Sequence, residues 1–232
     1  MEEHHDFTQV AATDLPIALA DLHRTLPVDA SLELRTQGDR ARIADIVVGA
    51  GFAREADEPD LRVCRLRTLP DTVRAGMRLL VCGLNPSLRA ADAGVGFVTP
   101  GNRFWPAVLA AGLVSRDRDT RHALLGHDIG MTDLVKRATP RADAITRAEY
   151  RDGLARLDRL CAWLQPGAVC MVGLAGWRAA ADRRATAGWQ PQRLGDRPVY
   201  VMPSTSGLNA ATSLDTLAEH LRTASTLDRP VK

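Results

Sequence analysis

Apolar and polar positions along the chain change period in a way that alternates strand-like and helix-like stretches. Short apolar runs, typical of strands buried on both faces, occur at 79–82, 168–172 and 198–202. Around them, apolar residues recur at helical spacing over 102–112, 121–126, 146–164, 177–184 and 214–224. Strands that alternate with helices predict a parallel sheet with helices on both faces. We therefore expect an α/β protein, a three-layer α/β/α fold around a central, mostly parallel sheet.

The first 75 residues show a weaker pattern of the same kind. Helical spacing over 15–26 and 42–50 alternates with strand-like stretches at 31–35 and 60–68, whereas 1–12 shows neither and is predicted to be a mobile tail. We divide the chain into an α/β N-terminal extension, residues 1–75, and a main domain, residues 76–232. The extension is expected to pack beside the main domain, with extension of its sheet as one option. In the main domain, 129–135 is predicted to lead into a helical turn.

Within the extension, the stretch ADIVVGAGF (residues 44–52) resembles the C-terminal half of a class I methyltransferase domain. The glycine-rich loop that would hold a methyl donor is missing. Gly49 and Gly51 follow a helix and not a strand, which is typical of a helix C-cap. The resemblance implies a remnant without methyl-transfer activity.

Composition describes an ordinary globular protein, 45% hydrophobic and 25% charged. No run of about 18 apolar residues is present, so no membrane span is expected. The N-terminus has no basic segment followed by an apolar one, and we predict a cytoplasmic protein, nucleoid-associated and of bacterial type. The four cysteines form no CxxC pair and have no neighbouring His at zinc spacing. Buried thiols are favoured over a metal site, and neither a metal nor a cofactor is expected.

Charge is distributed unevenly. Residues 1–75 carry nine arginines against fourteen acidic residues, a formal charge of −5, whereas residues 76–232 carry +7. A basic domain is compatible with a polyanionic partner, but a solvated arginine-rich surface explains the same charge equally well.

Two polar loops follow predicted strands of the main domain. The first, after 79–82, carries Gly83, Asn85 and Pro86; the second, 203–209, reads PSTSGLN. Ligands of open parallel sheets bind at the carboxyl ends of the strands. An Asn before Pro is held extended, so Asn85 can orient a water while its NH2 group meets a substrate, or can simply close an Asx turn.

Four blocks of sequence then indicate a family. In order along the chain, these are GLNPS (83–87), NRFW (102–105) at a helix start, GMTDLVKRATP (130–140) and MPSTSGLN (202–209), with Phe97 between the first two. Together they resemble the mismatch-specific uracil/thymine-DNA glycosylases over about residues 76–225. The resemblance implies a uracil-DNA glycosylase-like fold and a monofunctional enzyme that flips uracil out of G-mismatched duplex DNA. It would then hydrolyse the N-glycosidic bond and leave an abasic site.

The resemblance also implies roles for individual residues. Asn85 would be catalytic by positioning the attacking water, and Phe97 would stack on the base. The base-binding set is Gly83, Leu84, Pro86, Ser87, Ala90, Phe97 and Asn102. Leu208 would be the wedge that fills the gap left by the base. The set that forms the wedge and contacts phosphates or the widowed guanine is Ser204, Thr205, Ser206, Gly207, Leu208, Asn209 and Arg103.

Departures from the family pattern qualify this hypothesis. Ser87 replaces the second glycine of the first motif and puts the rate in doubt. Ala90 leaves room for a methyl group, so thymine in G:T pairs is a secondary substrate candidate. The first motif holds no acid, and Asp92 is the nearest carboxylate in the sequence, so slow turnover is expected. Lys136, Arg137 and Arg141 are candidate contacts to the DNA backbone.

The predicted partner is double-stranded DNA with a G:U or G:T mismatch, bound by a monomer. One alternative is a non-catalytic module that binds G:U lesions because Ser87 has spoiled the pocket. Another places the function in the N-terminal extension, as a methyltransferase or a partner-docking unit. The missing glycine-rich loop argues against a methyltransferase.

Overall fold

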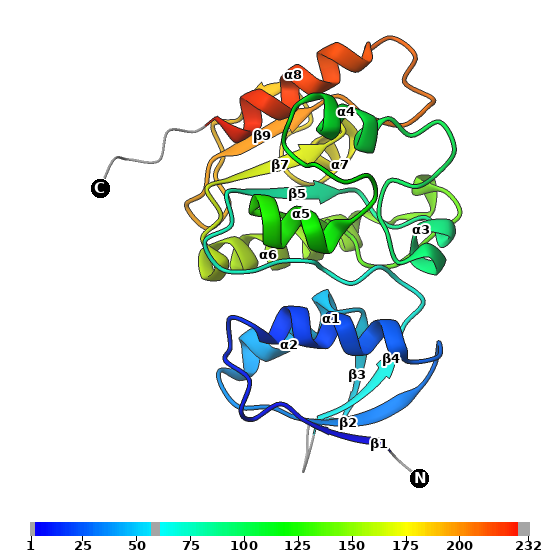
Figure 1. Ribbon diagram of the computed structural model, residues 1–232, viewed down its shortest axis with the longest axis vertical. Coiled ribbons are helices and arrows are strands. Elements are labelled where there is room, and N and C mark those ends of the chain that lie inside the picture. Colours follow the sequence, from blue (N-terminus) through cyan, green and yellow to red (C-terminus); the bar gives the residue numbers. More distant parts are fainter. Residues whose placement is uncertain (1–2, 57–60, 227–232) are drawn as a thin grey trace.

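Two separate β-sheets organise the chain into two stacked units (Figure 1). The computed structural model describes residues 3–56 and 61–226. The N-terminal unit contains β1 (Glu3–Asp6), α1 (Leu15–Thr25), β2 (Ser31–Arg35), α2 (Arg40–Gly49), β3 (Phe52–Ala56) and β4 (Leu61–Arg65). Its strand order is β1-β2-β4-β3, with β1 parallel to β2 and the other pairs antiparallel.

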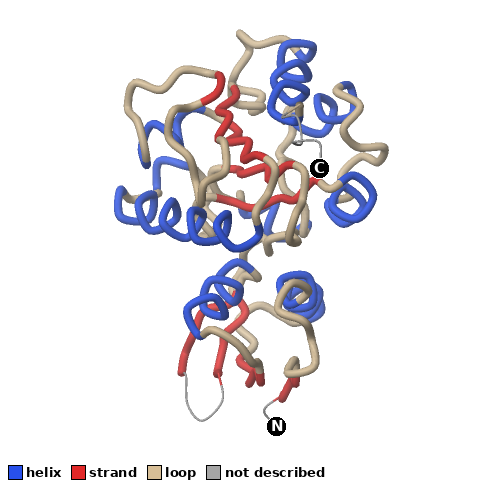
Figure 2. The backbone as a smooth tube through the Cα atoms, turned by 90° about the vertical axis from the view of Figure 1, so that its left-hand side faces the viewer, coloured by secondary structure: helices blue, strands red, loops and turns tan. Residues whose placement is uncertain are grey.

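Two expectations for this unit are wrong. Residues 3–6 are not part of a mobile tail, because their polar side chains stand on an edge strand whose backbone pairs with β2, Glu3 opposite Leu32. The sheet also does not extend that of the main domain. Its helices α1 and α2 lie between the two sheets and separate them (Figures 1 and 2).

The C-terminal unit is built on a five-stranded sheet of order β6-β5-β7-β9-β8, in which only β8 is antiparallel to its neighbour. Its strands are β5 (Leu79–Gly83), β6 (Ile129–Asp133), β7 (Ala168–Val172), β8 (Gly188–Trp189) and β9 (Val199–Met202). Its helices are α3 (Leu88–Ala93), α4 (Phe104–Ala110), α5 (Thr120–His127), α6 (Arg147–Leu164), α7 (Leu174–Ala180) and α8 (Leu214–Ser225), with a 3-10 turn at Ala142–Ala144.

Alternate residues of β5 face two different hydrophobic cores. Leu79 and Val81 pack in the core that contains residues of α4 and α8. Leu80 and Cys82 pack in the opposite core, with residues of α6 and α7. Side chains of a strand alternate between the two faces of its sheet, and here both faces are covered. The predicted three-layer α/β/α fold is thereby confirmed.

Residues 129–133 form a strand, β6, and not the approach to a helical turn. The whole strand is buried beside β5, with Leu79 opposite Ile129 and Gly83 opposite Asp133. This correction matters for the site, because it places the end of β6 next to the end of β5.

Ion pairs and one aromatic contact join the two units. Arg121 of α5 reaches Asp21 of α1 at 2.5 Å, and Arg159 of α6 binds both carboxylate oxygens of Asp45 of α2 at 2.7 and 2.8 Å. The guanidinium of Arg42 lies over the ring of Trp163, 5.2 Å from its centroid. The segment 66–78 links the units.

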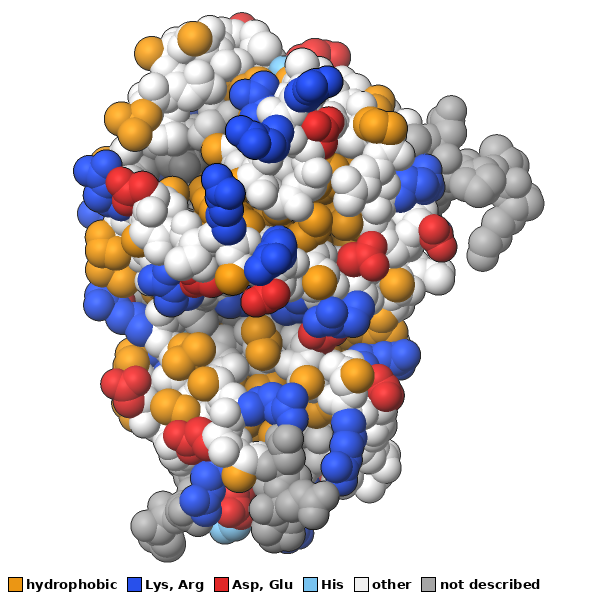
Figure 3. Space-filling model, turned by 180° about the vertical axis from the view of Figure 1, so that it is seen from behind, with side chains coloured by type: hydrophobic (Ala, Val, Ile, Leu, Met, Phe, Trp, Pro, Cys, Tyr) orange, Lys and Arg blue, Asp and Glu red, His pale blue; other side chains and the backbone are white. Residues whose placement is uncertain are grey.

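The surface and the cysteines add two observations. From behind, Lys and Arg side chains are interspersed with Asp and Glu over both units (Figure 3). All four cysteines are free, three of them buried, and burial raises the pKa of Cys170 to about 12. Among the described helices, none combines the length and apolar character that crossing a bilayer requires.

Candidate active site at the ends of β5 and β6

A pocket of about 100 Å³ opens where β5 and β6 end. It brings together Asn85 and every residue of the predicted base-binding set. Its lining consists of Leu69, Gly83, Leu84, Asn85, Pro86, Ser87, Ala90, Gly96, Phe97, Thr99, Asn102 and Asp133. The sequence therefore predicted most of this wall, and Leu69, Gly96, Thr99 and Asp133 are the additions.

Gly83 closes one side of the pocket and has no room for a side chain. A Cβ at this position would lie 2.4 Å from an oxygen of the Asp133 carboxylate and 3.4 Å from Cζ of Phe97. Gly83 and Asp133 are register partners in the parallel pair β5–β6. The absence of a side chain at Gly83 thus lets the Asp133 carboxylate lie against the backbone at the start of the Asn85 loop.

Asn85 is held by its amide nitrogen. Nδ2 donates to the carbonyl oxygens of Pro86 and Arg137, each at 3.1 Å, and to Oγ1 of Thr139 at 2.8 Å. Carbonyl oxygens only accept hydrogen bonds, so these partners fix which side of the amide is nitrogen. The expectation that the NH2 group meets the substrate is therefore wrong, because protein acceptors occupy it. The orientation of Oδ1 is set by these bonds, and Oδ1 is the atom that can accept a hydrogen bond from a water.

Phe97 stands between the pocket and the core. Its ring stacks on that of Phe104, with centroids 4.1 Å apart and planes inclined by 24°. The backbone of Phe97 is left-handed, with φ of 60°, a conformation that residues other than glycine rarely adopt. Trp105 fixes the backbone just before Phe97, because its indole Nε1 donates to the carbonyl oxygen of Gly96 at 2.9 Å. The Phe104 ring thus covers one face of Phe97, which also lines the pocket.

The remaining pocket residues are tied to helix starts. Ser87 is the N-cap of α3, and its Oγ accepts from the amide of Ala90 at 3.1 Å. Asn102 precedes α4, and its Oδ1 accepts from the amide of Phe104 at 2.9 Å. The Ser87 hydroxyl therefore has a structural role at the start of α3. Ala90 is buried in the pocket wall.

The second loop carries Leu208 on the surface beside this pocket. Leu208 is 97% exposed, the most exposed large hydrophobic residue among those described. At its neighbour Gly207, a Cβ would lie 3.1 Å from the Gly101 carbonyl oxygen, so this loop packs against the segment that contributes Thr99 and Asn102 to the pocket. The predicted wedge thus lies next to the pocket loop.

Other parts of the second loop differ from their predicted roles. Thr205 is 1% exposed and its side chain cannot reach a phosphate. Arg103 donates its guanidinium hydrogens to the carbonyls of Asn209 and Thr212, so those donors hold the loop and are not available to DNA. The Asn209 amide group donates to the Ser204 carbonyl at 2.7 Å, and its backbone NH to Ser206, so neither is free for a guanine. The hydroxyls of Ser204 and Ser206 each accept a backbone NH of the loop.

Among the four lining residues that sequence analysis missed, Asp133 is the one that carries a titratable group. Its side chain is buried in the pocket wall, and desolvation raises its pKa to about 6, with Asp71 acting in the same direction and Lys136 and Arg156 opposing. Asp92, expected to be the nearest acid, instead forms an exposed ion pair in which both oxygens lie 2.7 Å from Arg67. The available signal was the Thr132-Asp133 step at the end of an apolar run, which marks a strand end once β6 is recognised.

A family model for the uracil DNA glycosylase superfamily matches residues 70–227. The chain belongs to the uracil DNA glycosylase superfamily. Membership makes it a DNA glycosylase, a hydrolase of base excision repair whose substrate is DNA. The match leaves out most of the N-terminal unit, and the methyltransferase resemblance of that unit stays a prediction.

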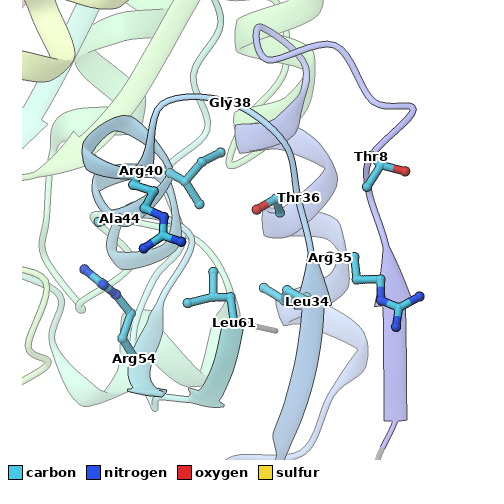
Figure 4. Close-up of a pocket in the computed structure, with 10 residues that line it drawn as sticks. Thr8, Leu34, Arg35, Thr36, Gly38, Arg40, Ala44, Arg54 and Leu61 are labelled. Atoms are coloured by element: carbon cyan, nitrogen blue, oxygen red, sulfur yellow. The ribbon is translucent and has the colours of Figure 1, made fainter. Parts of the chain in front are cut away.

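A second cavity shares no lining residue with the β5–β6 pocket. It has a volume of about 370 Å³ and lies in the N-terminal unit, between β2, α2 and β3. Arg40 of α2 and Arg54 of β3 flank it beside Leu61 (Figure 4). It is larger than the β5–β6 pocket, but none of the residues that the family motifs single out lines it. Within the described residues, no group of three or more His, Cys, Asp or Glu is arranged to hold a metal ion.

Proposed function

We propose that this glycosylase removes uracil, and more slowly thymine, from mismatches with guanine in duplex DNA. The observation that carries the proposal is the juxtaposition in one small pocket of an anchored amide, Asn85, a buried acid, Asp133, and an aromatic ring, Phe97. The loop that packs against the 99–102 segment of the pocket carries an exposed apolar side chain, Leu208. Together these groups meet the needs of a reaction on a base that has left the helix.

The flipped base enters the pocket and stacks on Phe97. Ala90, at the wall, leaves space near the base. The base carbonyls and N–H groups then face backbone and side-chain polar groups of the loops that start at Gly83 and Gly96. Charge that develops on the departing base is stabilised by donors already in place, which costs no reorganisation in the transition state.

Asn85 and Asp133 act on the water. As the bond between C1′ and the base nitrogen breaks, its electron pair leaves with the base and C1′ becomes electron-poor. The Asn85 Oδ1 atom accepts one hydrogen bond from the water and orients its oxygen toward C1′. Asp133, ionised above about pH 6, accepts the proton that the water loses as the new C1′–O bond forms. The departed base anion takes a proton from solvent and Asp133 gives its proton back to solvent. The products are therefore the neutral free base and an abasic sugar, and no enzyme–DNA bond forms.

The test is release of the base in a single turnover from a set of duplexes. Uracil, thymine, hypoxanthine or ethenocytosine is placed opposite guanine, and uracil also opposite adenine, and strand cleavage after alkali reports abasic sites. We expect the fastest release from G:U, slower release from G:T, and the least from A:U. Equal release from G:U and A:U would refute specificity for the mismatch.

The non-catalytic lesion-binding alternative predicts a different outcome of the same test. Such a module would bind G:U duplexes more tightly than G:C duplexes and yield no abasic sites. The Ser87 hydroxyl, which motivated that alternative, caps α3 and is directed to the Ala90 amide. This placement favours an intact pocket and therefore catalysis.

Leu208→Ala tests the wedge. We expect about tenfold slower release of uracil from duplex G:U. Without the apolar side chain that fills the gap in the base stack, the flipped state of the base is less stable. Release from single-stranded DNA should be unchanged, since no stack has to be kept open. Equal losses on both substrates would contradict the wedge role and point to damage in the pocket.

Ala90→Val tests the methyl specificity. The larger side chain narrows the wall of the pocket, so release of thymine from G:T should fall about tenfold, more than release of uracil from G:U. Measuring both rates on the same preparation provides the control. Unchanged G:T rates would show that Ala90 does not face the 5-methyl group.

A further inference from the structure

A buried cluster of charges lies behind the end of β6. At its centre is the carboxylate of Asp71, which is 3% exposed. It accepts from Lys136 Nζ at 2.7 Å, from an Arg156 guanidinium nitrogen at 2.9 Å and from Oγ1 of Thr132 at 2.7 Å. The sequence suggested that Lys136 contacts the DNA backbone. It does not, because its ammonium group is buried in this cluster.

Asp71 reaches the cluster from the segment that links the two units. Its backbone NH donates to the carbonyl of Gly49, the last residue of α2, at 2.8 Å. A Cβ on Gly49 would lie 2.5 Å from an Asp71 carboxylate oxygen and 3.0 Å from a guanidinium nitrogen of Arg156. The N-terminal unit thus closes the cluster, which lies outside the β5–β6 pocket.

The same segment also contributes to the pocket wall. Leu69 lines the pocket, and its carbonyl accepts from Lys136 Nζ at 2.6 Å. Arg156 additionally donates to the backbone carbonyl of Asp133 at 3.3 Å. The cluster is therefore connected to the pocket at two points, Leu69 and Asp133.

Asp133 is surrounded by a small set of charged and titratable groups. Behind it lie Asp71 of the linking segment, Lys136 of the loop after β6, and Arg156 of α6. Among the described residues, the thiol of Cys82 on β5 is a further titratable neighbour, and burial keeps its pKa high and the group neutral. Apart from Asp133, the described residues that line the pocket carry no charge. The balance at Asp133 is thus between two cations and one competing anion.

We infer that Asp71 is a positioning residue for the glycosylase reaction, holding Lys136 and Arg156 to itself and thereby preserving the Asp133 carboxylate as a proton acceptor. Without the negative charge of Asp71, the attraction of Lys136 and Arg156 for the Asp133 carboxylate would no longer be offset. An opposite charge nearby favours the ionised form of a carboxyl and weakens it as a base. The inference rests on the role proposed above for Asp133.

Two substitutions should move the titration of Asp133 in opposite directions. Asp71→Asn keeps the shape of the side chain and removes the competing anion. The pH midpoint of the Asp133 titration should therefore fall by roughly one unit. Lys136→Met removes a cation and should raise the midpoint by a similar amount. The experiment measures the Asp133 side-chain carboxyl by ¹³C NMR against pH, and the pH dependence of single-turnover uracil release, in the full chain. Arg67→Ala, which breaks an exposed ion pair with Asp92, is the control and should leave the midpoint in place.

Each outcome decides for or against the inference. Opposite shifts support it, whereas lower rates with an unmoved midpoint in both variants would reduce Asp71 to a purely structural residue and overturn it. If Asp71→Asn does not fold, Lys136→Met alone decides, because an unshifted midpoint there also overturns the inference. A wild-type protein that released no uracil would refute the proposed function, and the NMR titration would still report whether Asp71 and Lys136 control Asp133.

Discussion

Replacing Asn85 by alanine is expected to slow release of uracil from a G:U duplex by about a thousandfold. A positioned group that orients a reacting water contributes on the order of 10²–10⁴ to the rate. The amide is held at three protein acceptors, so its loss removes an oriented group and not a mobile one. Single-turnover rates at saturating enzyme isolate the chemical step, and binding to a duplex with a non-cleavable uridine analogue should stay within about threefold of wild type.

Two matched variants separate orientation from mere presence of a polar group. Thr139→Val removes the shortest contact to Asn85, at 2.8 Å, and should cost about tenfold while Asn85 remains. Asn85→Asp keeps the size, but a carboxylate cannot donate to the carbonyls of Pro86 and Arg137, so we expect a loss close to that of alanine. A fully active Asn85→Asp variant would contradict an anchoring role for Nδ2.

Elements with strong local signals were predicted well from the sequence. The helix Arg147–Leu164 was predicted over 146–164 from its helically spaced apolar residues, and the structure adds a capping box of Thr146 and Glu149 at its start. The strand Ala168–Val172 was located to the residue, since it is an apolar run bounded by Gly167 and Gly173. Period and caps are properties of neighbouring residues, so a single sequence reveals them.

Elements that depend on distant partners were missed. Strand β1 is a polar edge strand formed only by pairing with β2, and β3 contains polar and charged residues. The six-residue helix α3 is too short to show a period. Strand β6 was interpreted as the approach to a helical turn because its Thr132-Asp133 end breaks the apolar pattern.

The same contrast holds for the site. The Asn85 loop and Phe97 were identified because they lie close together in a motif. Asp133 lies 48 positions after Asn85 and becomes its neighbour only through the register of β5 and β6. Thr205 was given a DNA contact because it lies in the second motif of the resemblance, but the structure buries it, and a motif match does not reveal which of its side chains are buried.

Replacing Asp133 by asparagine is expected to slow uracil release about a hundredfold. It should also abolish the decrease of the release rate at acidic pH. In the wild type, Asp133 must be ionised to accept a proton, and burial raises its pKa to about 6. Release should therefore rise with pH through about 6 and level off above about 7, and at pH 5 it should be about tenfold below the plateau. Asp133→Asn should give a low rate that does not change between pH 5 and 8, measured in single turnovers on G:U duplex.

The same substitution should stabilise the folded protein at neutral pH. The folded pKa of Asp133, about 6, lies above its ordinary value of 3.8, so the folded state holds the proton more tightly than the unfolded state. The cost of ionising Asp133 is absent below about pH 4, grows as the pH rises to about 6, and amounts to about 3 kcal/mol above that. Asn is isosteric and uncharged, so thermal unfolding at pH 8 should occur at a higher temperature in Asp133→Asn than in wild type, with the difference vanishing near pH 4. A variant that is slower and equally stable at pH 8 would show that the carboxyl is ionised without cost, and the pH dependence of release would then need another group. A slower but more stable variant would show that the fold retains a destabilising acid at the end of β6 because the reaction requires it.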